Sequence, residues 1–413
     1  MRCRVLAPDS TAPPLSKRIV IKTSSVIRIP VTRPLHAAGS RLGGKDPEAA
    51  LSYSSANAQK GTIMPRKQLP LTLAIAAALA LPATASAYEI IGKQLEIYGQ
   101  AHVSADFVDN DTDSEVALAS NSSRLGFKGV TAINDELDVL YQIESKILFD
   151  EGGDTFAGRN TFVGFGGDFG KALFGNQDTP VKNVRNAFDL FGDSVADARN
   201  VMNEANRRAK NSIQYVSPSM GGLIASAMYA TSFEDRETDE GIEDNDYNLY
   251  SVALGYSLND LSFSAGYERS NGETTDLGLV TEDTDTFRLA ASYQLGQVRL
   301  GAIFDRFEEG NNERDAWGLN GAYKFDEKNT LKLQYVMADD WSEQDDSGAS
   351  QWSIGLDHKL AKNLNIYGIY SQLDNDDGTD DYQIKGGHDT DVYQVAALGD
   401  DINVFSLGMV YKF

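Results

Sequence analysis

Alternation of apolar and polar residues with a period of two is the feature of this chain that most limits its fold. It begins after Tyr88 and continues in many segments to the last residue, Phe413. Every second side chain from Phe405 to Phe413 is apolar, and most of those between are small or polar. This period indicates β-strands whose two faces meet different surroundings. No stretch of 18 or more apolar residues occurs, which excludes a bundle of membrane-spanning helices.

The alternation predicts sixteen strands. An even number suits a closed antiparallel barrel, and a barrel of this width leaves an aqueous channel. The expected strands are centred near Gly99, Gly126, Gln142, Val163, Leu173, Gln214, Ala227, Ala253, Ala265, Ala290, Ala302, Asn320, Gln334, Ile354, Gly368 and Gly408.

Two all-β architectures could bury one face of such strands. A soluble sandwich would bury the apolar face in its core, whereas an outer-membrane barrel would turn it to lipid and its polar face to a water-filled lumen. Short turns such as Asn259-Asp260 alternate with long acidic loops such as Glu234 to Asp246 and Asp374 to Asp401, which favours the barrel. Aromatic residues near strand ends favour it too, because they suit an interfacial girdle: Tyr98, Phe149, Tyr256, Tyr293, Tyr323 and Phe325.

A secretory signal precedes the alternating region. From Met64 the chain has a basic start, an apolar core from Leu69 to Leu81, and the small-residue cleavage motif Ala85-Ser86-Ala87. The earlier segment is rich in Arg, Ser and Pro, as an organelle transit peptide is, but a secretory signal normally begins a chain. We therefore expect an unstructured upstream extension from a misassigned start (1–63), a signal peptide (64–87) and one barrel domain (88–413).

The mature chain is strongly acidic. Residues 88–413 hold 25 Lys and Arg against 57 Asp and Glu, a net charge of −32, which argues against a nucleic-acid partner. The only cysteine, Cys3, lies in the leader, so the mature chain has no disulfide and no thiolate metal site. His102, His358 and His388 show neither a nucleophile-base arrangement nor metal-ligand spacing, so we expect neither an enzyme nor a cofactor.

One connection breaks the pattern. The 31 residues from Asp178 to Arg208 alternate little, and a long connection of this kind is usually functional. They combine apolar Phe188, Leu190 and Phe191 with carboxylates, so the loop could pack against the inner wall and narrow the lumen; an exposed cap is the alternative. The loop acids are Asp189, Asp193, Asp197 and Glu204.

Residues from Gln94 to Phe413 resemble the sixteen-stranded trimeric general porins of Gram-negative outer membranes, especially the proteobacterial type. The resemblance rests on the order of four motifs and on the terminal Phe. The chain departs from the family in having Gln100 where many relatives carry a wall lysine, and in lacking a Pro-Glu-Phe-Gly-Gly string in the loop. The motifs are LEIYGQAHVSADF, SSRLGFKG, RNTFVGFGGDFGKALFGNQDTP and NSIQYVSP.

The resemblance implies passive diffusion of small hydrophilic solutes and ions through a constriction, where the third outer loop faces arginines on the wall. It matches Arg124 and Arg159 to wall arginines, Arg207 or Arg208 to a basic residue before the sixth strand, and Asp189 and Asp193 to loop acids. Lys128 shares the polar face of Arg124 by parity. The expected constriction residues are thus Arg124, Lys128, Arg159, Asp189, Asp193, Asp197, Glu204, Arg207 and Arg208.

We expect this channel in the outer membrane, surrounded by lipid and lipopolysaccharide. The small lipid-facing residues Gly99, Ala101 and Gly129 suit contact with another barrel, and the resemblance implies a homotrimer. The acidic charge predicts a weak cation preference that fades at high salt. A substrate-specific outer-membrane channel, and less readily a barrel-borne enzyme or an adhesin, stay open as alternatives.

Processing can be tested directly. Signal cleavage after Ala87 should leave Tyr88 at the amino terminus of the membrane form, and intact-mass spectrometry of outer-membrane fractions measures this. A membrane form that retains Leu69 to Leu81 would contradict the secretory interpretation.

Overall fold

The computed structural model describes residues 88–89, 93–152, 156–231, 233, 248–271, 282–385, 393–395 and 397–413, which belong to the unit Pro70–Phe413. The expected upstream extension (1–63), the signal peptide (64–87) and the acidic loop Glu234 to Asp246 lie outside the described residues. None of the described helices is long and apolar enough to cross a membrane.

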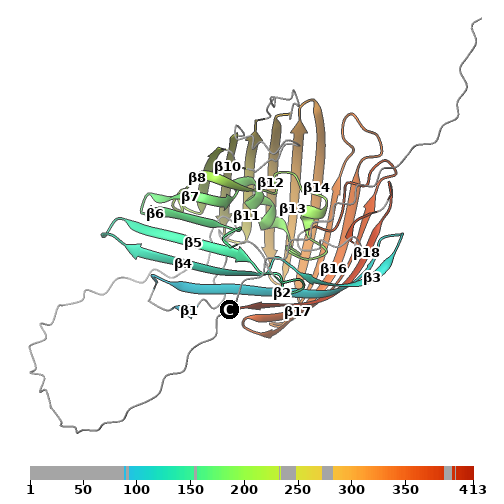
Figure 1. The fold of residues 1–413 in the computed structure, drawn as a ribbon, viewed down its shortest axis with the longest axis horizontal. Coiled ribbons are helices and arrows are strands. Elements are labelled where there is room, and N and C mark those ends of the chain that lie inside the picture. The colour runs from blue at the N-terminus through green and yellow to red at the C-terminus, as the bar shows by residue number, and fades with distance from the viewer. Residues whose placement is uncertain are drawn as a thin grey trace, which may run out of the picture. The chain divides into compact units, whose positions relative to one another are not determined.

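The strands form one closed antiparallel ring (Figure 1). β2 (Glu96–Asp109) pairs on one side with β18 (Ile402–Lys412) and on the other with β3 (Ser114–Ser120) and β4 (Arg124–Ala132). From β4 onward each strand pairs with the next along the chain. The others are β1 (Tyr88–Glu89), β5 (Asp138–Lys146), β6 (Thr161–Gly167), β7 (Gly170–Asp178), β8 (Arg208–Val216), β9 (Leu223–Thr231), β10 (Asn248–Leu258), β11 (Leu261–Ser270), β12 (Thr284–Leu295), β13 (Val298–Glu309), β14 (Asn312–Lys324), β15 (Asn329–Ala338), β16 (Ala349–Ala361) and β17 (Leu364–Asn375).

This ring confirms the predicted sixteen-stranded barrel. Each predicted strand centre falls within β2 or one of the strands from β4 to β18. β3 and β4 share one position in the ring, because β3 pairs with the second half of β2 and β4 with its first half. The sequence did not predict the break between them, where Ser122 has a φ of 53° that a regular strand does not allow.

The apolar face of the strands points outward, as predicted. On β12, Phe287 and Tyr293 are exposed, while Thr286 and Arg288 are buried on the inner side. Tyr98 was predicted to belong to the interfacial aromatic girdle, and the structure places it on the inner face instead. It shares the inner face of β2 with Gln100, is buried, and donates a hydrogen bond to Glu144 (2.9 Å), because its parity, not its place near a strand end, decides its direction.

Aromatic rings cover two of the small residues that were expected to face lipid, Gly99 and Gly129. The Phe413 ring covers Gly99, where a Cβ would lie 2.4 Å from a ring carbon, and the Tyr141 ring covers Gly129. Gly99 and Phe413 also exchange two backbone hydrogen bonds of 2.8 and 3.1 Å. The glycines therefore hold aromatic rings from neighbouring strands, which single-strand parity cannot reveal.

The two ends of the barrel differ in their connections. At one end every described connection is a turn of two to six residues, such as 259–260 between β10 and β11. At the other end the connections reach 29 residues between β7 and β8 and 26 residues between β17 and β18. The first of these long connections, residues 179–207, we call the inner loop.

Candidate functional site

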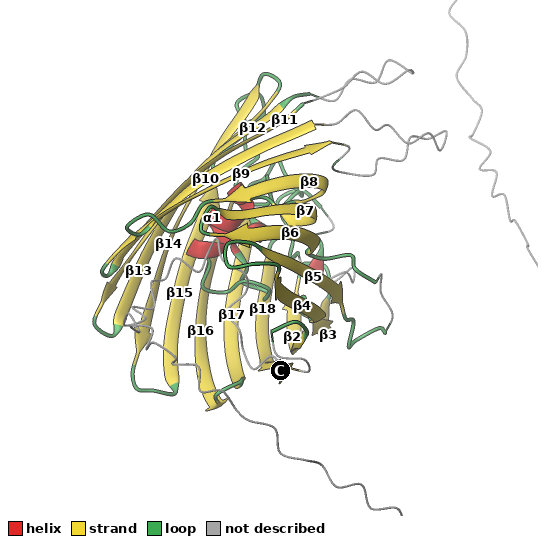
Figure 2. Ribbon diagram, turned by 90° about the vertical axis from the view of Figure 1, so that its left-hand side faces the viewer, coloured by secondary structure: helices red, strands yellow, loops and turns green. Residues whose placement is uncertain are grey.

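The inner loop is folded, which the sequence did not predict. It contains α1 (Pro180–Phe188) and a 3-10 helix, η1 (Ala198–Asn200). Thr179 caps α1 by accepting a hydrogen bond from the Lys182 amide (3.3 Å), and Pro180 suits the first helical turn because it has no backbone N–H that would need an acceptor there. Asp197 caps η1 in the same way. Figure 2 shows α1 in red within the ring of strands.

Apolar side chains of the inner loop pack on glycines of the inner wall. Val184, Phe188 and Phe191 are almost fully buried. A Cβ on Gly355 would lie 2.5 Å from the Phe191 ring, and one on Gly318 would lie 3.0 Å from the Phe188 ring. These wall positions need glycine because the loop approaches them so closely.

Polar side chains of the same wall hold the loop backbone. An irregular segment inside a barrel must find partners for its carbonyl groups, and here strands β13 to β16 supply the donors. The donors and the carbonyls that accept are Arg299 to Ala187 (2.9 Å), Asn320 to Phe188 (2.7 Å), Lys332 to Leu190 (2.9 Å), Gln334 to Ala196 (3.2 Å) and Gln351 to Val195 (3.1 Å).

The opposite side of the loop faces cations on the other wall. Arg124 on β4 lies 3.5 Å from Asp193, so the loop spans the lumen. Beside this contact, Arg159 pairs with Glu144 (2.7 Å). Six basic and five acidic side chains line a cavity of about 500 Å³ here, and we call them the charged cluster. Its members are Arg124, Arg159, Lys182, Arg185, Arg199, Arg208, Glu144, Asp178, Asp189, Asp193 and Asp197.

The three loop aspartates differ in environment. Asp193 lies between Arg124 (3.5 Å) and Arg199 (3.6 Å), and its side chain is 30% exposed. Although burial alone would raise its pKa, these arginines hold the pKa of Asp193 well below its usual range. Its φ of 62° is unusual for a residue other than glycine and turns the chain sharply toward the cavity.

Asp197 and Asp189 shape the loop. Asp197 is 3% exposed and pairs with Arg199 (3.1 Å) and Arg185 (3.6 Å), which lower its pKa against the effect of burial. Asp189 accepts hydrogen bonds from the amides of Phe191 (2.8 Å) and Ala198 (3.0 Å). Burial, with the nearby charge of Asp197, raises the pKa of Asp189 to about 7.

The other predicted site residues lie in several places. Arg208 joins the charged cluster through Asp178 (3.0 Å). Arg207 pairs with Glu268 (3.3 Å), and Glu204 pairs with Arg314. Lys128 pairs with Glu96 (3.4 Å), and the cavity it lines is one bounded by the short turns rather than by the charged cluster. The structure therefore separates Lys128, Glu204 and Arg207 from the cluster.

Sequence reasoning missed several members of the charged cluster. Glu144 stood on the polar face of a predicted strand, so parity already placed it inside. Asp178, Lys182, Arg185 and Arg199 lie in or next to the inner loop, and their roles depend on its helices, which the alternation does not report. Among the residues the structure describes, no group of three or more His, Cys, Asp or Glu could hold a metal ion.

Comparisons with known proteins agree on one family. The model of the Gram-negative porin family matches residues 72–378. The chain is 28% identical over 317 residues to outer membrane porin protein 32 of Delftia acidovorans, covering 71% of this chain and 88% of the relative.

Solved structures share the fold. An anion-selective porin from Comamonas acidovorans is similar with a TM-score of 0.64 and 24% identity, covering 78% of this chain and 99% of that one. A trimer form of OmpT from Vibrio cholerae is similar with a TM-score of 0.55 and 21% identity, covering 78% of this chain and 99% of that one.

Loop docking should be separable from barrel stability. Phe188→Ala removes a ring that is 1% exposed, and we expect it to weaken the docking of the inner loop by about 3 to 5 kcal/mol while the barrel ladder persists. Limited proteolysis within residues 180–207, together with thermal unfolding of the barrel, measures the two effects. Asn186→Ala, an exposed position on the same helix, should leave cleavage unchanged. Equal cleavage in both variants would contradict the role of Phe188.

Proposed function

This chain belongs to the Gram-negative porin family, and from that premise we propose how its outer-membrane channel is narrowed and charged. Small hydrophilic solutes and ions diffuse passively through the lumen, and no bond is made or broken. The constriction is the charged cluster, where the inner loop crosses toward β4. The observation that carries this proposal is Asp193, which meets the cavity between a loop arginine and a wall arginine.

Opposed charges in this throat create a transverse field. Arg124 and Arg159 stand on one side, and Asp193 projects from the loop on the other. Such a field orients polar solutes and their water, and it disfavours apolar solutes that cannot replace that water. Six of the expected constriction residues belong to the proposed constriction: Arg124, Arg159, Arg208, Asp189, Asp193 and Asp197. The other three lie elsewhere in the lumen: Lys128, Glu204 and Arg207.

Charge selectivity follows from two regions. The throat is nearly balanced, with six basic and five acidic groups, while the mature chain as a whole carries −32. The acidic excess outside the throat raises the local concentration of cations at the channel mouth, so the preference for cations is weak and fades as salt shortens the Debye length. The anion selectivity named for the Comamonas acidovorans porin is the competing outcome.

Single charge changes should move this selectivity. Asp193→Asn removes an ionised group at the throat and should lower the cation-to-anion permeability ratio about twofold at 0.1 M salt. Because the pKa of Asp189 is about 7, wild-type cation preference should rise as pH increases from about 5 to 8, where this carboxyl ionises. Reversal potentials in planar bilayers measure both effects.

The matched variant is Asp189→Asn. It should abolish the rise in cation preference between pH 5 and 8, while Asp193→Asn should keep that rise because Asp193 is ionised throughout the range. Unchanged reversal potentials in Asp193→Asn at low salt would place this residue outside the constriction. Arg124→Gln should shift the potential in the opposite direction.

We also propose a homotrimer within outer-membrane lipid and lipopolysaccharide. Large apolar side chains are exposed on β3 and on the loop between β5 and β6, where Leu118 and Phe156 respectively are each 71% exposed. This loop packs against β3, because Asp150 accepts a hydrogen bond from the Ser120 amide (2.6 Å). Adjacent exposed apolar groups of this kind are typical of a protein contact. The trimer form of the Vibrio cholerae protein supports the number three.

Removing apolar groups from this patch should weaken the trimer. Phe149→Ser with Phe156→Ser should cost each subunit contact about 3 kcal/mol or more and raise the monomer fraction after crosslinking in mild detergent. Leu295→Ser removes a 62% exposed side chain from β12 and is the control, which should leave the trimer intact. Equal monomer fractions in the two variants would argue against this patch.

A further inference from the structure

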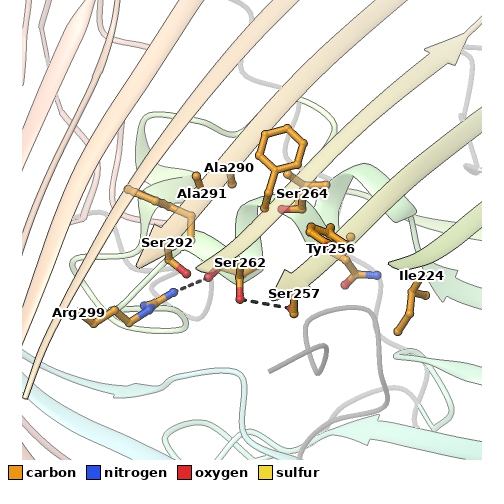
Figure 3. A pocket seen from close by; sticks show the side chains of 15 residues that line it. Ile224, Tyr256, Ser257, Ser262, Ser264, Ala290, Ala291, Ser292 and Arg299 are labelled. Carbon is orange, nitrogen blue, oxygen red and sulfur yellow. Dashed lines mark hydrogen bonds between the residues drawn. The ribbon is translucent and has the colours of Figure 1, made fainter. Parts of the chain in front are cut away.

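A recess lies between helix α1 and the inner wall of β9 to β13 (Figure 3). Its volume is about 70 Å³, and it opens to solvent. Ser257 and Ser262 flank the short turn 259–260, and Ser292 and Arg299 flank the short turn 296–297. The recess therefore lies on the side of the inner loop that faces the short turns, which is the periplasmic side in a porin.

One part of the recess is apolar. Ala187 of α1 and Ile224 of β9 are half-buried and present its apolar surface, and Val184 and Phe188 lie almost fully buried beside them. Small wall residues, such as Ala290, leave the space open. Apolar walls with a few polar groups are typical of sites for small molecules.

The other part of the recess carries hydroxyl groups and one cation. Ser257 and Ser262 lie within hydrogen-bond distance of each other (3.3 Å), and Ser264 and Ser292 line the same wall. Figure 3 places Arg299 beside Ser292 and Ser262 at one edge. The Arg299 guanidinium donates one hydrogen bond, to the Ala187 carbonyl, which leaves further N–H groups to serve a ligand.

Arg299 differs from the cations of the charged cluster. Each basic residue of that cluster has a carboxylate within 4 Å, as the pairs of Lys182 with Asp178 (2.7 Å) and Arg185 with Asp197 (3.6 Å) illustrate. Among the ion pairs of the described residues, none includes Arg299, and the recess has no acidic lining residue. A guanidinium without an acidic neighbour is free to pair with an anion from solution.

We propose that this recess binds small amphiphilic anions, each with one carboxylate and a short apolar or aromatic body. The carboxylate pairs with Arg299 and accepts from the serine hydroxyls, and part of the apolar body packs against Ala187 and Ile224. This inference rests on the proposed channel function and adds a class of solute that binds on the periplasmic side of the constriction. Solutes of this class should then enter the narrow region more slowly than inorganic anions of similar size.

Benzoate is a suitable probe, with benzylammonium as its cationic counterpart. Single-channel recordings in KCl should show brief, concentration-dependent interruptions of the current when benzoate is added on the side of the short turns, and fewer when it is added on the opposite side. Benzylammonium should cause none. Arg299→Gln should raise the half-blocking benzoate concentration about tenfold or more.

Two further variants separate the outcomes. Lys171→Gln removes a cation from another part of the inner wall and should keep the block. Ser264→Phe fills the recess without removing a loop contact and should abolish the block while KCl conductance persists. The proposal is overturned if benzoate leaves wild-type current unchanged, or if it blocks Arg299→Gln and Ser264→Phe as strongly as wild type. Absence of KCl conductance in the wild type would instead contradict the proposed channel.

Discussion

Hydrogen bonds from the inner wall to carbonyl groups of the inner loop are the interaction on which the narrow region depends. A loop that enters a barrel gives up water, and each unsatisfied carbonyl would cost about 1 to 3 kcal/mol. Side chains such as Asn320 and Gln351 replace that water. Because these donors project from a closed ring of strands, they fix the loop in position, and the apolar contacts of Phe188 and Phe191 exclude solvent behind it.

The fixed loop decides which carboxylates serve structure and which meet the lumen. Asp197 pairs with two arginines and accepts from the Asp193 amide, so it sets the turn on which Asp193 stands. Asp189 accepts from two backbone amides of the loop and also lines the cavity. Asp193 is the one of these three that keeps a 30% exposed side chain between two arginines. The constriction therefore contains more charged side chains than face the lumen, because several of them hold the others in place.

Strand parity predicted the barrel, its strand number and its two faces, because the period of a strand is a local property of the sequence. It could not predict how far along the barrel axis a side chain lies or which residues it contacts. Arg124 and Lys128 share a face, yet four residues of strand separate them by about 13 Å, and only Arg124 reaches the inner loop. The ring of Phe413 over Gly99 and the inward Tyr98 depend likewise on neighbouring strands. The helices of the inner loop were missed because alternation carries no information about them.

The recess below α1 is a consequence of how the loop is held. The wall donates hydrogen bonds to the carbonyl groups of Ala187 and Phe188 at the carboxyl end of the helix, and several small side chains, such as Ser264 and Ala290, line the space beside the helix. Arg299 belongs to both arrangements, because it donates a hydrogen bond to the Ala187 carbonyl of the helix and also lines the recess. An anion paired with Arg299 would therefore adjoin the same helix whose continuation carries Asp193 into the throat, so occupancy of the recess and the geometry of the constriction share one structural support.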